Sequence, residues 1–156
     1  MKKKLSSPID LSLDIQFGSD ALKDKWKPIL SSRKIRKWVQ AGIKQSATLT
    51  IRLAEGRKLN REFRNKDYAT NILTFNYPSE SDELFSDLVI CMPVLTKEAR
   101  EQGKSTENHF IHLLIHGLLH AQGFDHEDTI EAEAMESLEI NILANLGLEN
   151  PYLSQR

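Results

Sequence analysis

The chain of 156 residues is long enough for one domain that buries a hydrophobic core without disulfide support. Apolar residues make up 40% of it and charged residues 28%, a balance that excludes an intrinsically disordered protein. The net charge of −1 conceals an asymmetry, because residues 1–78 contain 17 Lys and Arg and 7 Asp and Glu, whereas residues 79–156 contain 4 and 15. The basic first half is typical of a protein that binds a polyanion.

The start of the chain and its single cysteine indicate the cellular compartment. The N-terminus begins with MKKK, but Pro8, Asp10 and Asp14 interrupt the segment that follows, so a secretory signal peptide is not expected. No apolar run approaches the length needed to span a bilayer. Cys91 lies in the apolar run DLVICM, which indicates a buried, reduced thiol. We therefore expect a cytoplasmic protein that does not enter the membrane.

The first elements of the chain are a strand and two helices. Strict alternation of apolar and polar residues predicts a half-buried strand over residues 9–17. Helices are expected over residues 20–29 and 31–44, and either Ser31 or Ser32 caps the second one. The inward face of this second helix is expected to consist of Ile35, Trp38, Val39 and Ile43.

Three further strands are expected at the sequences ATLTIRLA, NILTFNY and DLVICM, and a short helix over residues 54–64 separates the first of them from the other two. Every segment after Pro93 has a helical pattern, with helices expected over residues 93–102, 106–122 and 129–146. The core-facing stripe of the last helix is expected to consist of Ile130, Ala134, Leu138 and Ile142. The predicted fold class is therefore α/β: a single layered domain over residues 1–156, with a mixed sheet of about four strands, five or six helices and a helical C-terminal half.

All five histidines of the chain lie between positions 109 and 126. Residues four apart share one face of a helix, so His116 and His120 are placed to bind the same metal ion. Gly123 permits the left-handed turn that ends a helix, after which His126 can approach the other two imidazoles. Three imidazoles without an obvious fourth ligand are typical of a catalytic zinc site. We predict one Zn²⁺ per chain at these three histidines, although nickel or copper would also bind such a site.

The spacing matches the zinc-protease motif HExxHxxGxxH, except that Gly117 stands where those enzymes have a glutamate general base. Because a positioned base contributes about 10²–10⁴-fold to a rate, its absence argues against a metalloprotease. Asp125, the only acid inside the motif, either orients a ligand imidazole or acts as a base itself. His109 and His112 are partners of the ligands, a substrate-facing pair or structurally satisfied histidines, and neither is predicted to bind the metal.

The basic segment RLAEGRKLNREFRNK, residues 52–66, contains the candidates for binding an anionic substrate. If it is helical, Arg57, Arg61 and Arg64 share one face. A solvated basic face is the simpler interpretation of Arg57 and Arg61. An arginine close to the metal is suited to bind a phosphodiester and to stabilise the negative charge that develops during its cleavage.

Several motifs resemble those of the YbeY family of bacterial rRNA-maturation endoribonucleases. HGLLHAQGFDH is similar to the family signature H-G-x-L-H-x-x-G-Y/F-D-H, and REFRNKDYATNILTF is similar to its second motif. SDLVIC and LGLENPY resemble a strand and the C-terminus of the family, so the similarity extends to about Tyr152. The resemblance implies that His116, His120 and His126 bind the metal and that Arg64 is the functionally important arginine.

The same resemblance implies a zinc-dependent, single-strand-specific endoribonuclease that acts in 16S rRNA 3′-end maturation and ribosome quality control. Its expected partners are single-stranded RNA, the 16S rRNA precursor and the small ribosomal subunit. Arg64 and Asp125 are the predicted catalytic residues, and the nucleophile is either water or the 2′-hydroxyl group of the RNA. The alternatives are a non-catalytic ribosome-assembly factor with a structural zinc ion and, less favoured, a metalloprotease.

Overall fold

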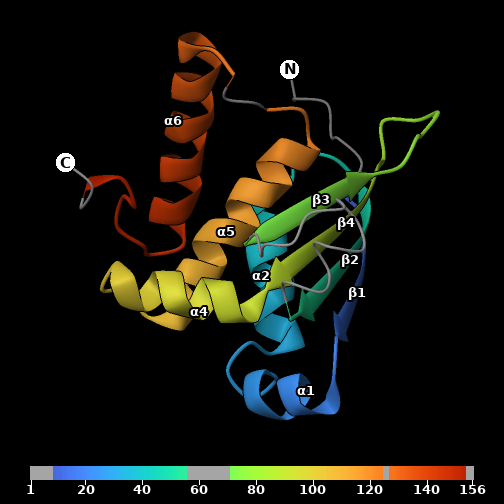
Figure 1. Cartoon of the computed structure of the whole chain (residues 1–156). Helices are drawn as coiled ribbons and strands as arrows, with labels where there is room; N and C mark the ends of the chain where they lie inside the picture. Colours follow the sequence, from blue (N-terminus) through green and yellow to red (C-terminus); the bar gives the residue numbers. More distant parts are fainter. Residues whose placement is uncertain (1–8, 56–70, 125–126, 154–156) are drawn as a thin grey trace.

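A four-stranded mixed sheet lies at the centre of the computed structural model, which describes residues 9–55, 71–124 and 127–153 (Figure 1). The strands are β1 (Leu11–Phe17), β2 (Ala47–Ala54), β3 (Ile72–Asn76) and β4 (Leu84–Cys91). Their order in the sheet is β1-β2-β4-β3. β1, β2 and β4 are mutually parallel, whereas β3 pairs with β4 in the antiparallel direction. The prediction of about four strands in a mixed sheet is therefore confirmed.

The described part of the chain contains five helices. They are α1 (Asp20–Trp26), α2 (Ser32–Gly42), α4 (Met92–Glu101), α5 (Thr106–Ala121) and α6 (Thr129–Asn145). α1 and α2 connect the parallel strands β1 and β2, as parallel pairing requires a crossover of this length. The described elements that follow β4 are all helices, which confirms the predicted α/β class and the helical C-terminal half.

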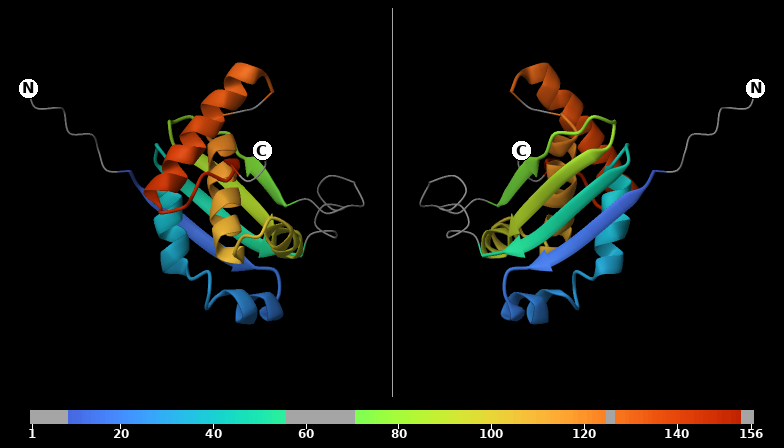
Figure 2. Two further views of the ribbon diagram at one scale, coloured as in Figure 1. Left: turned by 90° about the vertical axis from the view of Figure 1, so that its left-hand side faces the viewer. Right: turned by 90° about the vertical axis from the view of Figure 1, so that its right-hand side faces the viewer.

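The helices α2 and α5 cover one face of the sheet: the left view of Figure 2 shows these helices in front of the strands, and the right view shows the strands in front. Val39 of α2, Leu88 of β4 and Leu114 of α5 are all 0% exposed and belong to one hydrophobic cluster. Burial of each such side chain contributes about 1.5–3 kcal/mol to the hydrophobic stabilisation. The core therefore fixes α5, the helix with most of the histidines, against the sheet.

The element predictions for the first half of the chain are largely confirmed. β1 has the expected alternation of half-buried and exposed side chains. The Ser31 side chain accepts a hydrogen bond from the Lys34 backbone N–H and so caps α2. The four residues predicted to face inward from this helix are buried: Ile35, Trp38, Val39 and Ile43. The predicted helix over residues 54–64 falls mainly on residues 56–64, outside the described residues, and Ala54 itself ends β2.

The predicted core-facing stripe of α6 is correct only toward its C-terminal half. Ile130 is 79% exposed and Ala134 is exposed as well. The residues that α6 buries are Met135, Glu139, Ile142 and Leu143. Ile130 is exposed because it lies at the N-terminal end of α6, which projects beyond the rest of the molecule (Figure 1). The predicted stripe also omits Glu139, which takes an inward position where its carboxylate has three side-chain partners.

The predicted burial of the single cysteine is also borne out. The Cys91 side chain, at the end of β4, is buried and only 2% exposed. Among the described residues, no helix combines the length and the apolar character that crossing a membrane requires.

Candidate metal centre

Four histidines form a row along one side of α5, in the order His109, His112, His116 and His120. The centroids of successive rings are 5.9, 6.4 and 4.8 Å apart. Their spacing of three, four and four residues keeps them on one face of the helix. The crowding of histidines in the sequence therefore corresponds to a continuous line of imidazoles in the fold.

The shortest ring separation in the row joins His116 and His120, whose centroids lie 4.8 Å apart with an interplanar angle of 74°. The His116 side chain is 25% exposed, so the pair lies near the surface at the C-terminal end of α5. Neutral imidazole nitrogens are ligands that zinc prefers. The two residues thus fit the predicted metal site in position and in donor chemistry.

The remaining predicted site residues lie outside the described residues: Arg64, Asp125 and His126. Accordingly, within residues 9–55, 71–124 and 127–153 no group of three His, Cys, Asp or Glu side chains is placed to hold a metal. The turn that precedes His126 is described, and Gly123 has the predicted left-handed conformation with φ of 102°. α5 ends at this turn, where the Phe124 N–H donates to the Leu119 carbonyl. α5 therefore ends one residue after His120, and the third ligand stays a prediction.

Gly117 faces the sheet, not the imidazoles. A Cβ atom at this position would lie 2.6 Å from Cδ1 of Ile72 and 3.2 Å from Cδ2 of Leu88. A glutamate here would therefore enter the apolar contact between α5 and strands β3 and β4. The position that supplies the general base in zinc proteases faces apolar side chains in this protein.

Glu139 of α6 is a residue that the sequence analysis missed. It is 0% exposed, and its Oε2 atom lies 2.9 Å from Nδ1 of His116 and 3.4 Å from Nε2 of His112. Its Oε1 atom accepts a hydrogen bond from the Tyr152 hydroxyl. Burial raises the pKa of this carboxyl, but the hydrogen bonds from His112, His116 and Tyr152 outweigh burial and lower the pKa to about 2. Glu139 is therefore an ionised carboxylate inside the protein.

The only hint of Glu139 in the sequence is its spacing from Met135. A helix face that begins with Met135 and continues four residues later reaches Glu139 and then Leu143. An apolar face with a single carboxylate is unusual, because Glu is almost never fully buried without partners. The partners come from α5 and from Tyr152 near the end of the described chain, so no local pattern reveals them.

His109, at the other end of the row, pairs with a different carboxylate. Its Nε2 atom lies 2.9 Å from Oε1 of Glu98, on α4. Burial lowers the pKa of His109, although the hydrogen bond to Glu98 partly opposes the effect. At neutral pH this ring is uncharged, so its Nε2–H donates to Glu98 and joins α5 to α4. Of the three roles open to His109 from the sequence, the geometry matches a structural residue, whose Nε2 is paired and whose buried Nδ1 has no hydrogen-bond partner among the described residues.

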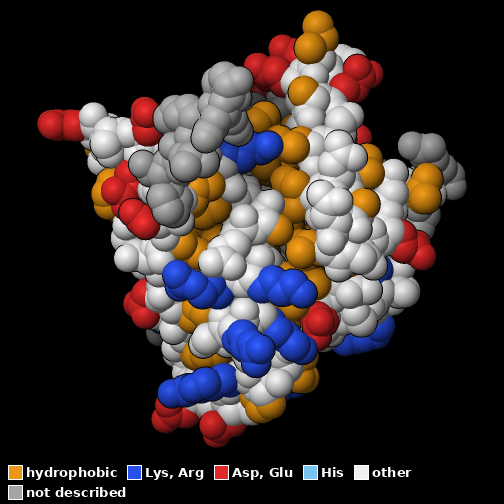
Figure 3. All heavy atoms as spheres, turned by 180° about the vertical axis from the view of Figure 1, so that it is seen from behind, with side chains coloured by type: hydrophobic (Ala, Val, Ile, Leu, Met, Phe, Trp, Pro, Cys, Tyr) orange, Lys and Arg blue, Asp and Glu red, His pale blue; other side chains and the backbone are white. Residues whose placement is uncertain are grey.

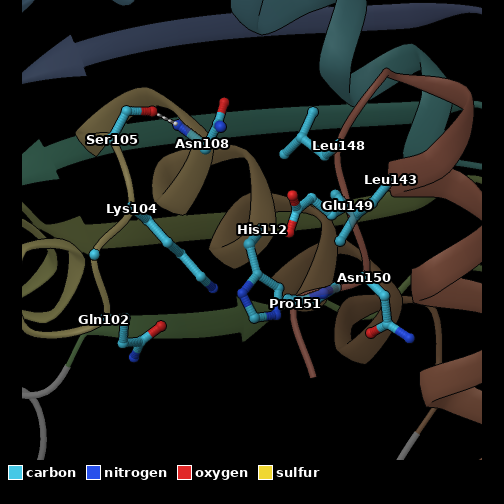
Figure 4. Close-up of a pocket in the computed structure, with 11 residues that line it drawn as sticks. Gln102, Lys104, Ser105, Asn108, His112, Leu143, Leu148, Glu149, Asn150 and Pro151 are labelled. Carbon is cyan, nitrogen blue, oxygen red and sulfur yellow. Dashed lines mark hydrogen bonds between the residues drawn. The ribbon is translucent and has the colours of Figure 1, made fainter. Parts of the chain in front are cut away.

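A cavity of about 310 Å³ adjoins the histidine row at His112 (Figure 4). In Figure 4 the Lys104 side chain points toward the His112 ring. Lys104 Nζ and His112 Nδ1 are buried and have no hydrogen-bond partner in the described part of the chain. Burial lowers the pKa of Lys104, and the nearby carboxylates of Glu139 and Glu98 act in the opposite direction. The cavity wall thus contains a buried amine whose protonated form is disfavoured by burial, and two nearby acids offset this effect only in part.

The chain is similar to a known protein family, to named relatives and to a solved structure. The family model described as Endoribonuclease YbeY matches residues 14–147. A protein of Polynucleobacter asymbioticus named Endoribonuclease YbeY is 48% identical over 153 residues, which cover 96% of this chain and 99% of that protein. A protein of the same name from Aromatoleum aromaticum is 57% identical over 125 residues, covering 78% and 80%. The solution structure of TM1509 from Thermotoga maritima shares the fold, with a TM-score of 0.56 and 21% identity over 92% of this chain and 95% of that one.

Proposed function

Because the chain belongs to the YbeY endoribonuclease family, we propose that it is a metal-dependent endoribonuclease that hydrolyses phosphodiester bonds of single-stranded RNA. The observation that carries the proposal is the adjacent pair of imidazoles, His116 and His120, at the end of α5. With His126 they complete the HGLLHAQGFDH motif. The biological substrate in this proposal is the 16S rRNA precursor, whose 3′ end the enzyme matures on the small ribosomal subunit as part of ribosome quality control.

The three histidines would hold one zinc ion, which supplies Lewis-acid catalysis at the scissile phosphate when it is bound. Arg64 binds a phosphate oxygen and stabilises the charge that develops on it. Asp125 either orients a ligand imidazole or removes a proton from the nucleophile. Gly117 makes room for the close approach of α5 to the sheet, and His116 and His120 lie on the adjoining side of the same helix.

A basic surface supports an RNA substrate. Exposed lysines and arginines on α1, on α2 and between them form what we call the α1–α2 basic surface: Lys23, Lys25, Lys27, Arg33, Lys34, Arg36 and Lys37. Figure 3 shows Lys and Arg side chains gathered over the lower half of one face of the molecule, where these helices lie. Histidines of the described residues are not visible on this face. We propose that this surface binds the RNA backbone at a distance from the site of cleavage.

Incubating the zinc-loaded protein separately with single-stranded RNA, with the same RNA as a duplex and with casein tests the proposal. Cleavage of the single strand alone is expected. Cleavage of casein would indicate a metalloprotease instead. A protein that binds zinc and RNA but cleaves none of the three substrates would be an assembly factor with a structural metal, and the proposed activity would be wrong.

A further inference from the structure

Glu139 is a buried carboxylate that the proposed catalytic steps do not use. Its side chain is 0% exposed, on a helix whose neighbouring acid Glu136 is exposed. A buried carboxylate is costly unless hydrogen bonds replace the water that it loses. Both oxygens of Glu139 are indeed bound by the protein, so its position is determined by its partners and not by solvent.

These partners come from two separate segments of the chain. On one side, Oε2 faces the α5 imidazoles at 2.9 Å from His116 Nδ1 and 3.4 Å from His112 Nε2. On the other side, Oε1 accepts the hydroxyl hydrogen of Tyr152. The Tyr152 ring also packs edge-on against His112, with ring centroids 5.8 Å apart. The carboxylate therefore cannot rotate away from His116 without giving up its interactions with the other two residues.

The contact with His116 determines which ring nitrogen carries the proton. An ionised carboxylate only accepts hydrogen bonds, so Nδ1 of His116 must be protonated to donate to Glu139. In a neutral imidazole the lone pair then belongs to Nε2. A metal-binding histidine commonly donates its other N–H to a carboxylate in this way, which fixes the ring and makes the ligand nitrogen more basic.

We infer that Glu139 is a positioning residue, which holds His116 in the Nδ1–H tautomer so that Nε2 is its metal-binding nitrogen, while Tyr152 and His112 hold Glu139. The inference rests on the proposed metal site. It goes beyond that site by giving a role to α6 and to Tyr152, neither of which contributes a predicted ligand. Tyr152, near the end of the described chain, thus acts on the proposed metal site through the carboxylate of Glu139.

Nitrogen-15 NMR of the histidine rings tests the tautomer in metal-free protein, and competition with a chromophoric chelator measures zinc affinity. Wild-type His116 should show the Nδ1–H tautomer. In Glu139→Gln the amide can also donate, so the Nε2–H tautomer should become populated and zinc affinity should fall by roughly 10–100-fold. Tyr152→Phe keeps the carboxylate and should weaken zinc binding by less. The matched control is Glu136→Gln, an exposed substitution on the same helix, which should change neither measurement.

The inference is overturned if folded Glu139→Gln keeps the wild-type tautomer of His116 and binds zinc within twofold of wild type. If Glu139→Gln does not fold, Tyr152→Phe decides by the same two measurements, and unchanged zinc affinity in that variant overturns the inference. Failure of the proposed function looks different. Wild-type protein would then bind no zinc, or would bind zinc and cleave no RNA, whereas the tautomer of metal-free His116 would still respond to Glu139→Gln.

Discussion

Oε2 of Glu139 lies 2.9 Å from Nδ1 of His116, so a buried carboxylate of α6 and a partly exposed imidazole of α5 form one hydrogen-bonded pair. At the other end of the histidine row, Glu98 of α4 makes an equivalent contact with His109 at the same distance. Two carboxylates from two helices thus hold a row of imidazoles on a third. This arrangement separates the row into an end that is structural, at His109, and an end at which we propose the metal binds, at His116 and His120.

Substitution of Arg64 tests whether this residue has a catalytic role or a structural one. Arg64→Ala should leave zinc content and Tm nearly unchanged, because the predicted contact is made to the substrate. Removing a charge-assisted interaction formed mainly in the transition state should raise the barrier by about 3–4 kcal/mol, on the order of 10²–10³ in cleavage rate. Arg64→Lys should restore only part of the rate, since a point charge does not reproduce the bidentate guanidinium.

Arg57→Ala and Arg61→Ala are the controls for this measurement, and each should weaken RNA binding modestly without abolishing cleavage. An Arg64→Ala protein that unfolds would show that the residue is structural. One that cleaves RNA at the wild-type rate would rule out its catalytic role.

The α1–α2 basic surface should contribute to RNA affinity and not to the chemical step. In Arg33→Gln, Lys37→Gln the affinity for single-stranded RNA should fall, and the slope of log affinity against log salt should decrease by up to about 0.7 for each phosphate that the protein no longer neutralises. The rate of cleavage at saturating RNA should not change. Lys97→Gln, Arg100→Gln removes the same charge from exposed positions of α4 and serves as the control. Equal reductions of affinity in the two double variants would mean that net charge, and not this surface, governs binding.

Gly117→Glu should destabilise the protein instead of creating a protease. The new carboxylate would enter the apolar contact with Ile72 and Leu88, where an unpaired buried charge costs about 3–5 kcal/mol. Denaturant unfolding measures this loss. Ala134→Glu, at an exposed helical position, should change the free energy of unfolding by no more than about 0.5 kcal/mol. A stable Gly117→Glu variant that cleaves casein would show that a carboxylate at position 117 can act as a general base, contrary to this prediction.

His109 should make the stability of the metal-free protein depend on pH. Burial lowers the pKa of His109 in the folded state below its ordinary value of 6.5, with Glu98, Lys104 and His112 as its charged or titratable neighbours. As the pH falls below about 6.5, the unfolded chain takes up a proton that the folded protein disfavours, so the free energy of unfolding decreases. In His109→Gln this decrease should be smaller, because the other histidines titrate in both proteins. If the free energy of unfolding of the two proteins fell by the same amount between pH 7 and pH 5, His109 would not be a cause of the pH dependence.

Much of the fold could be predicted because its signals are local. The alternation of β1, the serine cap of α2 and the left-handed turn at Gly123 each depend on residues within a few positions of one another. The proximity of His116 and His120 was predictable for the same reason, since a helix brings residues four apart together. The antiparallel direction of β3 against β4, by contrast, depends on pairing across the sheet, which the pattern of each strand by itself does not reveal.

Glu139 shows most clearly why part of the site could not be predicted. Local pattern favours an exposed glutamate on a helix, and the predicted stripe of α6 accordingly places the neighbouring Leu138 inward. The structure buries Glu139 because donors from α5 and from Tyr152 converge on it. Hydrogen bonds between distant segments therefore help to determine which face of α6 is buried, and these are not visible in hydrophobic periodicity.

We propose that His116, His120 and His126 hold one metal ion that RNA cleavage requires. The most direct measurement is to remove metal with a chelator, add zinc back in steps and follow bound zinc and cleavage of single-stranded RNA together. Cleavage should be absent without metal, rise in proportion to bound zinc and level off at one ion per chain. The double variant His116→Ala, His120→Ala should neither bind zinc nor cleave RNA. Full cleavage by metal-free protein, or an unchanged zinc content in the double variant, would contradict the claim.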